Sequence, residues 1–329
     1  MENFDIAMGI VRVTEGAALA CSKLLGRGNS SEVDKAAVDG VRHAFDLLPI
    51  KGRVVIGECE LNKSPIMYIG EKVGMWEDGL KKYDIAIDPV DGNNLVAKGR
   101  SNAISAIAVA EEGGIFKAPQ IYMKKIAVGP SAKGSIDINA SVEENITNVS
   151  KALGKDIDEM TVAILDRKRH ENLIKEARST GARVKIFGEG DIAAALSTAF
   201  EDSGIDILMG IGGAPEGVLA AAALKCLGGE ILGKLMPENE KQMAMCRRVG
   251  ISDIDRVLSQ DDLILKDDVF FAATAITDFE LLKGVTYKDN SASTHSVVMR
   301  STNGIIRFVD ASHKLDRSMI NINDEINFS

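Results

Sequence analysis

The residues with the clearest capacity for chemistry are two aspartates at the end of an apolar stretch, in residues 84–92. The residues before Asp88 have the pattern of a buried strand, and Pro89 with Gly92 predicts a turn directly after it. Asp88 and Asp91 should therefore leave the sheet close together, where like charges raise each other's pKa unless a cation lies between them. Asp and Pro are also common in turns without any catalytic role, so this motif alone leaves both interpretations open.

A second acidic pair, Glu58 and Glu60, follows another apolar stretch at residues 54–57. Because side chains alternate along a strand, the two glutamates share one face of any continuation of that strand. Carboxylates at the ends of two apolar strands suit hard divalent cations, which prefer oxygen ligands, and neither motif has the His or Cys pattern of a zinc site. Taken singly, each pair is also consistent with solvent-exposed strand ends.

A glycine-rich stretch, residues 210–217, follows an expected strand at 205–209 and opens an expected helix. Glycines ahead of a helix let backbone N–H groups approach a phosphate. Dinucleotide-binding motifs share this context, but Pro215 stands where their third glycine would be, which disfavours that alternative. Glu216 beside Pro215 is also an ordinary residue for a helix start, where an acid complements the helix dipole.

Two helices are predicted near the N-terminus from the spacing of apolar residues. The first ends before Gly26 and Gly28, and the second covers residues 33–48. Ser31 is the expected N-cap of the second helix, and Asp34 has the spacing of the acidic residue in a capping box. Without further information, these positions predict a structural role for Asp34.

Beyond a polar stretch at residues 141–159, strands and helices alternate, which predicts an α/β arrangement with parallel strands and crossover helices. We place a domain boundary near residue 155, between an N-terminal α+β domain (1–155) and a C-terminal α/β domain (156–329). Whether the strands expected in the last 60 residues or so join the second sheet or return to the first is left open. The other strands expected are at 84–88, 103–110, 121–128, 161–165 and 183–187, with helices at 170–180, 192–200 and 216–227.

The composition excludes several classes of protein. With 45% hydrophobic and 26% charged residues in 329, the chain is globular, and its net charge of −9 disfavours binding to nucleic acid or anionic membranes. The four cysteines are scattered, which indicates reduced thiols and not a disulfide framework. No apolar run reaches the length of a membrane span, and the first residues are acidic where a signal peptide is basic, so we expect a cytoplasmic protein.

Taken together, several blocks resemble the class II fructose-1,6-bisphosphatases of bacteria, within the lithium-sensitive sugar and inositol phosphatase superfamily. The resemblance covers nearly the whole chain, whereas DPVDG by itself would indicate only the wider superfamily. It implies a sugar-phosphatase fold of alternating α and β layers, with a metal-binding first domain and a substrate-binding second one. The blocks are RVTEGAAL (12–19), GRG (26–28), AAVDGVR (36–42), VVIGECE (54–60), YIGEKVG (68–74), DIAIDPVDG (84–92), KAPQIYMKKIAVGP (117–130) and GIGGAPEGV (210–218).

The resemblance also implies roles for individual residues. The implied ligands of Mg²⁺ or Mn²⁺ are Asp34, Glu58, Asp88, Asp91 and Glu216. The implied catalytic residues are Asn93, Glu58 and Glu60, of which either glutamate could orient or deprotonate a metal-bound water. The implied substrate contacts are Asp91, Gly92, Asn93, Tyr122, Arg167, Lys168, Arg169, Glu189, Gly190, Asp191 and Gly213. A basic run on an acidic protein can hold the phosphate that is not cleaved, although residues 167–169 alone would indicate an exposed helix start.

The implied activity is hydrolysis of the 1-phosphate of fructose 1,6-bisphosphate to fructose 6-phosphate and phosphate, a step of gluconeogenesis. In that reaction a metal-activated water attacks phosphorus in line with the departing sugar oxygen. The implied partner is a small sugar bisphosphate, and the implied assembly is a homodimer or homotetramer.

The chain departs from the family pattern within the implied site. Asn93 stands where the family has Thr, whose hydroxyl helps to position the attacking water, and a carboxamide is longer and has no hydroxyl proton. Cys59 replaces a Gly, 167–169 is Arg-Lys-Arg in place of Lys-Pro-Arg, and 189–191 is Glu-Gly-Asp in place of Asp-Gly-Asp. Three hypotheses therefore stay open: a sugar bisphosphatase in which Asn93 positions the water, a phosphatase for sedoheptulose bisphosphate or an inositol phosphate, and a catalytically impaired homologue that binds metal and sugar phosphate.

Overall fold

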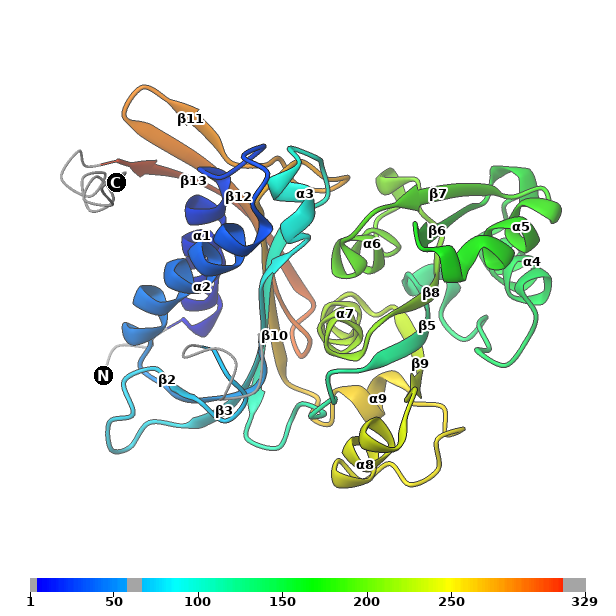
Figure 1. Cartoon of the computed structure of the whole chain (residues 1–329), viewed down its shortest axis with the longest axis horizontal. Helices are drawn as coiled ribbons and strands as arrows, with labels where there is room; N and C mark the ends of the chain where they lie inside the picture. The colour runs from blue at the N-terminus through cyan, green and yellow to red at the C-terminus, as the bar shows by residue number, and fades with distance from the viewer. Residues whose placement is uncertain (1–4, 58–66, 316–329) are drawn as a thin grey trace.

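In the computed structural model, which describes residues 5–57 and 67–315, helices and two β-sheets alternate in layers (Figure 1). Helices α1 and α2 cover the outer face of the first sheet, α6 and α7 lie between the sheets, and α4 and α5 cover the second sheet. The layered α/β fold expected from the sequence is therefore confirmed. The helices are α1 (Ile6–Ser22), α2 (Ser30–Asp46), α3 (Asn93–Ala97), α4 (Val142–Leu153), α5 (Glu171–Ser179), α6 (Asp191–Ser197), α7 (Ala214–Leu227), α8 (Glu240–Arg248) and α9 (Gln260–Leu263).

The first sheet combines strands from both ends of the chain. Its eight strands have the order β11-β12-β10-β4-β3-β1-β2, with β13 paired to β12. The strands from the last part of the chain thus return to the first sheet, which answers the question that the sequence left open. Its strands are β1 (Lys51–Ile56), β2 (Lys72–Val73), β3 (Lys82–Asp91), β4 (Ile104–Glu111), β10 (Val269–Ala275), β11 (Thr286–Lys288), β12 (Ser291–Arg300) and β13 (Ile305–Lys314).

The second sheet has five strands in the order β7-β6-β8-β5-β9. Strand β6 pairs in parallel with β7 and β8, as the alternating pattern predicts, whereas β5 is antiparallel to β8 and β9. Strand β5 precedes residue 155 in the chain but belongs to this second sheet, and α4 forms within the polar stretch where we placed the boundary. The strands are β5 (Tyr122–Val128), β6 (Thr161–Leu165), β7 (Arg183–Phe187), β8 (Ile207–Gly213) and β9 (Glu230–Met236).

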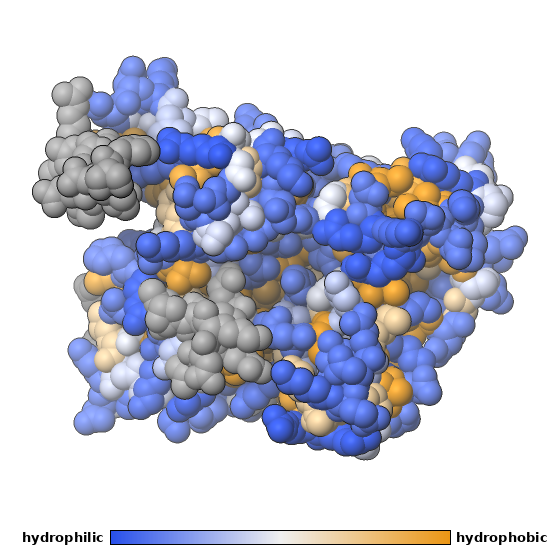
Figure 2. Space-filling model, viewed as in Figure 1, coloured by the Kyte–Doolittle hydropathy of each residue, from blue (hydrophilic) through white to orange (hydrophobic). Residues whose placement is uncertain are grey.

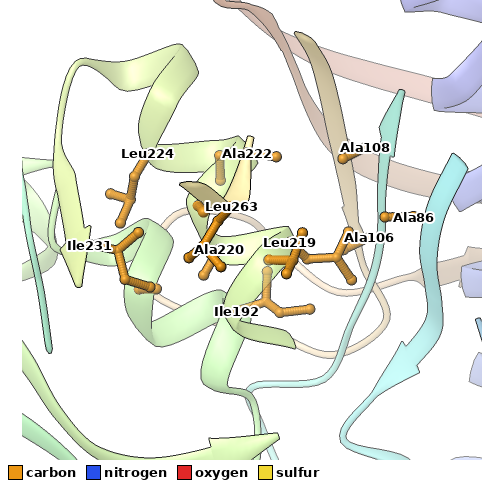
Figure 3. Close-up of a cluster of buried hydrophobic side chains, with 14 of the residues drawn as sticks. Ala86, Ala106, Ala108, Ile192, Leu219, Ala220, Ala222, Leu224, Ile231 and Leu263 are labelled. Atoms are coloured by element: carbon orange, nitrogen blue, oxygen red, sulfur yellow. The ribbon is translucent and has the colours of Figure 1, made fainter. Parts of the chain in front are cut away.

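Helix α7 joins the two sheets because it is apolar on all sides and rich in alanine. In Figure 3, Leu219 and Ala220 of this helix lie between Ala106 of the first sheet and Ile231 of the second. Small side chains on both the helix and the facing strand let their backbones approach closely. The tight packing fixes where the first turn of α7, which carries Glu216, meets the ends of the strands.

The start of α2 differs from the sequence prediction. Asn29, and not Ser31, is the N-cap, and its side chain accepts hydrogen bonds from the N–H groups of Ser31 and Glu32. An asparagine is as good a cap as a serine, so the helix begins earlier than expected. Asp34 consequently lies inside the helix and plays no part in capping it, which corrects the structural role predicted for it.

The face of the molecule in Figure 2 is mainly hydrophilic, with apolar residues in small separate areas. Within the described ranges, no helix combines the length and the apolar character that crossing a membrane requires.

Candidate active site

One cavity of about 350 Å³ collects most of the residues predicted to act on substrate or metal. It lies where the ends of β1, β3, β6 and β8 meet the beginnings of β5, α3, α6 and α7. Segments far apart in the sequence thus contribute to one site. The predicted residues that line it are Asp34, Asp88, Asp91, Gly92, Asn93, Tyr122, Arg167, Arg169, Glu189, Gly190, Asp191, Gly213 and Glu216.

Three predicted residues are not placed in this cavity. Lys168 is exposed in the short 3-10 helix Lys168–His170 and does not line it, so the basic run is split between lining and surface residues. Glu58 and Glu60 lie outside the described residues, and their catalytic and metal roles remain predictions.

The motif around Asp91 forms the strand end and turn that its sequence predicts. Strand β3 ends at Asp91, and Gly92 follows with φ of +103°, a left-handed conformation that glycine adopts without strain. Asp88 Oδ1 accepts a hydrogen bond from the N–H of Val90 (3.1 Å), which tightens the turn. Asp91 Oδ2 accepts another from the N–H of Ile192 in α6 (3.0 Å), so this carboxylate ties the first sheet to the helix layer.

Lys125 of β5 and Asp191 at the start of α6 form a buried charged pair beside the cavity, and they are 4% and 7% exposed. Lys125 Nζ donates to Asp191 Oδ2 (2.5 Å) and to the carbonyl oxygen of Gly213 (3.0 Å). Asp91 lies near the same pair, and its pKa is raised well above the usual range, first by burial and then by the charges of Asp191 and Glu216. Negative charge therefore outweighs positive charge in this part of the cavity.

Glu216 completes the acidic group from the first turn of α7. Burial raises the pKa of its carboxyl group, whereas the Lys125 ammonium lowers it. Its Oε2 atom is buried and has no hydrogen-bond partner among the described residues, which is costly unless another group binds there. A Cβ atom at Gly213 would lie 1.9 Å from that oxygen, so only glycine leaves room for this carboxylate.

These oxygens have the chemistry of a site for a hard divalent cation. All the donors are carboxylates, and an unpartnered buried oxygen is what such an ion would satisfy. In the described part of the chain, however, no three His, Cys, Asp or Glu side chains converge closely enough to hold an ion by themselves. The predicted set of metal ligands therefore also needs Glu58, which lies outside the described residues.

On another wall of the cavity, Asn93 binds the carboxylate of Asp34. Its Nδ2 donates to both oxygens of Asp34, at 2.9 and 3.0 Å. Burial raises the pKa of Asp34, the Asn93 hydrogen bond lowers it, and the charge of Glu189 raises it. Asn94 Nδ2 donates in turn to Glu189 Oε1 (2.8 Å), so the two asparagines after DPVDG each hold one carboxylate.

The basic side chains of the cavity are held by backbone carbonyls. Arg167 Nη1 donates to the carbonyl oxygen of Gly188 (2.6 Å), and Arg169 Nη2 donates to that of Ile211 (2.7 Å). The Arg169 guanidinium also lies over the ring of Tyr122, 4.5 Å from its centroid. Since carbonyls neutralise no charge, both guanidinium groups keep their charge available for an anion. Among the described residues, Arg167 has one carboxylate nearby, that of Glu189 at 3.8 Å.

His170 stabilises the backbone segment to which Arg169 is bound. Its ring lies between the carbonyl oxygen of Leu165, 2.8 Å from Nδ1, and the N–H of Ile211, which donates to Nε2 (2.8 Å). An accepting Nε2 requires a neutral ring, and burial lowers the pKa of His170 accordingly. Ile211 is therefore held at its N–H by His170 and at its carbonyl by Arg169.

The glycine-rich segment forms the end of a strand, and its predicted contact with a phosphate stays a prediction. Residues 210–213 continue β8 to Gly213, so the strand is longer than the predicted 205–209. At Gly212 a Cβ atom would lie 1.8 Å from Asp191 Oδ2 and 2.9 Å from Lys125 Nζ. In the structure, these glycines make room for buried charged side chains.

Sequence analysis missed several residues that shape the site. Lys125, Asn94 and His170 act through the contacts described above, and Gln120 Nε2 donates to the carbonyl oxygen of Gly57 (3.0 Å) at the cavity wall. Lys125 had a recognisable signal, because a lysine inside an apolar strand is almost never buried without a partner. The bond from Gln120 had no recognisable signal in the sequence, since it joins loops that are distant along the chain.

Comparison with known proteins agrees with the resemblance found in the sequence. The model of the family "Bacterial fructose-1,6-bisphosphatase, glpX-encoded" matches residues 4–313. The chain is 41% identical to D-fructose 1,6-bisphosphatase class 2/sedoheptulose 1,7-bisphosphatase of Synechococcus elongatus, over 94% of this chain and 96% of the relative. The relative of that name from Microcystis aeruginosa is also 41% identical, over 95% and 97% of the two chains.

Among solved structures, an IMPase from Thermotoga maritima superposes on 60% of this chain and 74% of its own, with a TM-score of 0.33 and 14% identity. The family model and the two relatives each cover nearly the whole sequence. The chain accordingly belongs to the family of glpX-encoded, class II bacterial fructose-1,6-bisphosphatases.

Proposed function

We propose that this cavity hydrolyses the 1-phosphate of fructose 1,6-bisphosphate, releasing fructose 6-phosphate and phosphate. The observation that carries the proposal is the division of the cavity into an acidic part, with Asp91, Asp191 and Glu216, and a basic part, with Arg167 and Arg169. A bisphosphate needs both: one phosphate must be activated for cleavage, and the other must be held. Membership of the bisphosphatase family supports this assignment.

The acidic part is proposed to hold Mg²⁺ or Mn²⁺ through Asp34, Asp88, Asp91 and Glu216, with Glu58 from outside the described residues. When bound, a divalent cation supplies charge neutralisation at the phosphate and a lowered pKa for an attacking water. The chain's contribution is to hold these carboxylates in the lining of one cavity. Asp91 is oriented by its bond from Ile192, and Glu216 by its place in the first turn of α7.

The basic part is proposed to bind the 6-phosphate. Arg167 and Arg169 are held by carbonyls in fixed positions, so binding a phosphate requires little reordering of their side chains. Tyr122 adds an aromatic surface beneath the Arg169 guanidinium. This arrangement favours a substrate with an anionic group at each end over one with a single phosphate.

Asn93 is proposed to replace the threonine of the family in orienting water. Its Nδ2 is directed to both oxygens of Asp34, which leaves Oδ1 as the atom that can accept a hydrogen bond from a water. An acceptor fixed in this way can orient a water but cannot pass on a proton. Removal of the water's proton would then fall to a carboxylate, for which Glu58 and Glu60 are the predicted residues.

The first experiment is phosphate release from fructose 1,6-bisphosphate with Mg²⁺ or Mn²⁺, with the sugar product identified by an isomerase-coupled assay for fructose 6-phosphate. We expect turnover that Asp88→Ala abolishes. Activity only in Asn93→Thr would show that the site lacks its water-orienting group, and the chain would then be a binding homologue. Absence of turnover in both proteins would contradict the proposal.

Sedoheptulose 1,7-bisphosphate is a second candidate substrate, because the relatives from both cyanobacteria are named for both activities. The ratio of kcat/KM for the two bisphosphates, measured in one assay, decides between them. The assembly is proposed to be a homodimer or homotetramer, which light scattering on the purified protein would test.

A further inference from the structure

We propose that Lys125 is a positioning residue of the active site, which holds Asp191 and the Gly213 carbonyl in the geometry that substrate binding needs. The inference rests on the proposed function and adds to it a residue that does not itself line the cavity. Its Nζ reaches Asp191 Oδ2 (2.5 Å) and the Gly213 carbonyl oxygen (3.0 Å), which both belong to lining residues.

Several glycines lie close to the Lys125 side chain. Lys125 lies opposite Gly210 on β8 and Gly233 on β9. A Cβ atom at Gly212 would lie 2.9 Å from its Nζ, and one at Gly217 would lie 3.2 Å from its Cδ. Gly212 and Gly217 thus leave room for the lysine side chain, and its two hydrogen bonds set the position of the ammonium group.

Each of its two bonds controls a different part of the site. The bond to Asp191 engages Oδ2, so Oδ1 of this carboxylate is the oxygen available to the cavity. The bond to Gly213 fixes the junction of β8 and α7, three residues before Glu216. Through these two contacts, one side chain sets the positions of a predicted substrate contact and a predicted metal ligand.

Stability alone does not account for a lysine in this place. A buried ion pair must overcome the desolvation of both charges, and replacing such a pair with apolar side chains is often neutral or stabilising. Strand β5 is otherwise largely apolar on its buried face, so an apolar residue would fit its pattern. The charge is nevertheless placed beside Asp191, with Asp91 and Glu216 close by, where it offsets part of the acidic field without occupying the cavity.

The chain offers a matched control in Lys155. Its Nζ lies 2.6 Å from Oδ1 of Asp206, whose side chain is 6% exposed, and Asp206 Oδ2 also accepts from the N–H of Thr161 (2.8 Å). This pair resembles Lys125–Asp191 in distance and in the burial of its carboxylate, although Lys155 itself is more exposed. It lies outside the lining of the cavity.

The test compares Lys125→Met with Lys155→Met. We expect Lys125→Met to lower kcat/KM for fructose 1,6-bisphosphate about 100-fold, because small misplacements of binding groups have large effects on rate. Lys155→Met should remain within about threefold of the parent protein. As a readout besides activity, calorimetric titration with fructose 6-phosphate should show binding at least tenfold weaker in Lys125→Met only.

A double-mutant cycle with Asp191→Asn tests whether Lys125 acts through Asp191. In the Asp191→Asn background, Lys125→Met should lower kcat/KM by less than about fivefold, because the group it positions is already altered. An equal loss in both backgrounds would overturn the inference, as would parental kcat/KM in Lys125→Met. If circular dichroism shows that Lys125→Met does not fold, Lys125→Gln is used in its place. This variant keeps an N–H donor, and the same criteria apply to it.

Failure of this inference is distinguishable from failure of the proposed function. If the parent protein hydrolyses fructose 1,6-bisphosphate and Lys125→Met does so equally well, only the role of Lys125 is wrong. If the parent neither hydrolyses it nor binds fructose 6-phosphate, the proposed function is wrong, and the role of Lys125 fails with it.

Discussion

The two acidic walls of the cavity are built in different ways. On one wall, the half-buried Asp34 of α2 accepts hydrogen bonds from the neutral amide of Asn93. On the other wall Asp191 is buried and bound by the ammonium of Lys125. A hydrogen bond from a neutral amide is readily exchanged for another partner, whereas breaking a buried ion pair leaves an uncompensated charge.

This difference indicates a division of roles between the walls. The wall of Asp34 can release its carboxylate to a cation when one binds, because Asn93 bears no charge that must be neutralised. The wall of Asp191 is pre-arranged and changes little on binding, which is the property expected of a group that sets geometry. Substitutions on the two walls should therefore lower the rate of phosphate release by different amounts.

The largest effect is expected for Asp91→Asn, which replaces a proposed metal ligand on the pre-arranged side. Phosphate release should fall by about 10³-fold, because the site loses a proposed ligand. The free energy of unfolding in denaturant at pH 7 should not fall, since burial and neighbouring carboxylates already disfavour the charged form of Asp91. Retained activity, or a protein much less stable than the parent, would contradict the assignment.

Gly212→Ala should have the next largest effect. Its Cβ atom would lie 1.8 Å from Asp191 Oδ2, so the ion pair with Lys125 must move, and we expect kcat/KM to fall about 100-fold. Gly188→Ala is the control, because a Cβ atom there meets only Leu95 Cδ2 at 3.6 Å, an ordinary contact. Steady-state kinetics of the two variants should differ sharply, and similar losses in both would show that any added methyl group disturbs this site.

Substitution on the other wall should cost less. Asn93→Ala removes the bonds to Asp34 and the proposed water acceptor, and we expect kcat to fall roughly tenfold. Asn93→Asp is the complementary variant: it keeps the shape but places two carboxylates together, so its loss should be greater than that of the alanine variant. The comparison of walls would be wrong if Asn93→Ala were as damaging as Gly212→Ala.

The smallest expected effect is on the pH dependence of stability. The pKa values of Asp91 and Glu216 are raised by folding, so the folded protein binds more protons than the unfolded chain above the ordinary values of 3.8 and 4.5. The free energy of unfolding should therefore decline as pH rises from that range. Mn²⁺ should raise the melting temperature by a few degrees, more at pH 8 than at pH 5, in differential scanning fluorimetry. An equal shift at both pH values would show that Mn²⁺ does not bind through these two carboxyl groups.

Part of the site could be predicted from local sequence, and the rest was implied by the resemblance to the family. An apolar run, a proline and a glycine are sufficient to predict that Asp88 and Asp91 end a strand at a turn, and the structure has that turn. The bond between Asn93 and Asp34 could not be predicted, since it joins residues 59 positions apart in the sequence. The cap at Asn29 was missed for a different reason: two residues of similar capping strength stood close together, and propensity does not choose between them.

By itself, the sequence determined the family, the alternation of helices and strands, and the residues gathered in the cavity, because each depends on short patterns read along the chain. Only the tertiary structure decided that β5 joins the second sheet, that the last strands return to the first, and that Lys125 meets Asp191. These outcomes depend on which surfaces pack together around α7. Such pairings bring together residues distant in sequence, and their energies depend on the burial and shape that the whole fold creates.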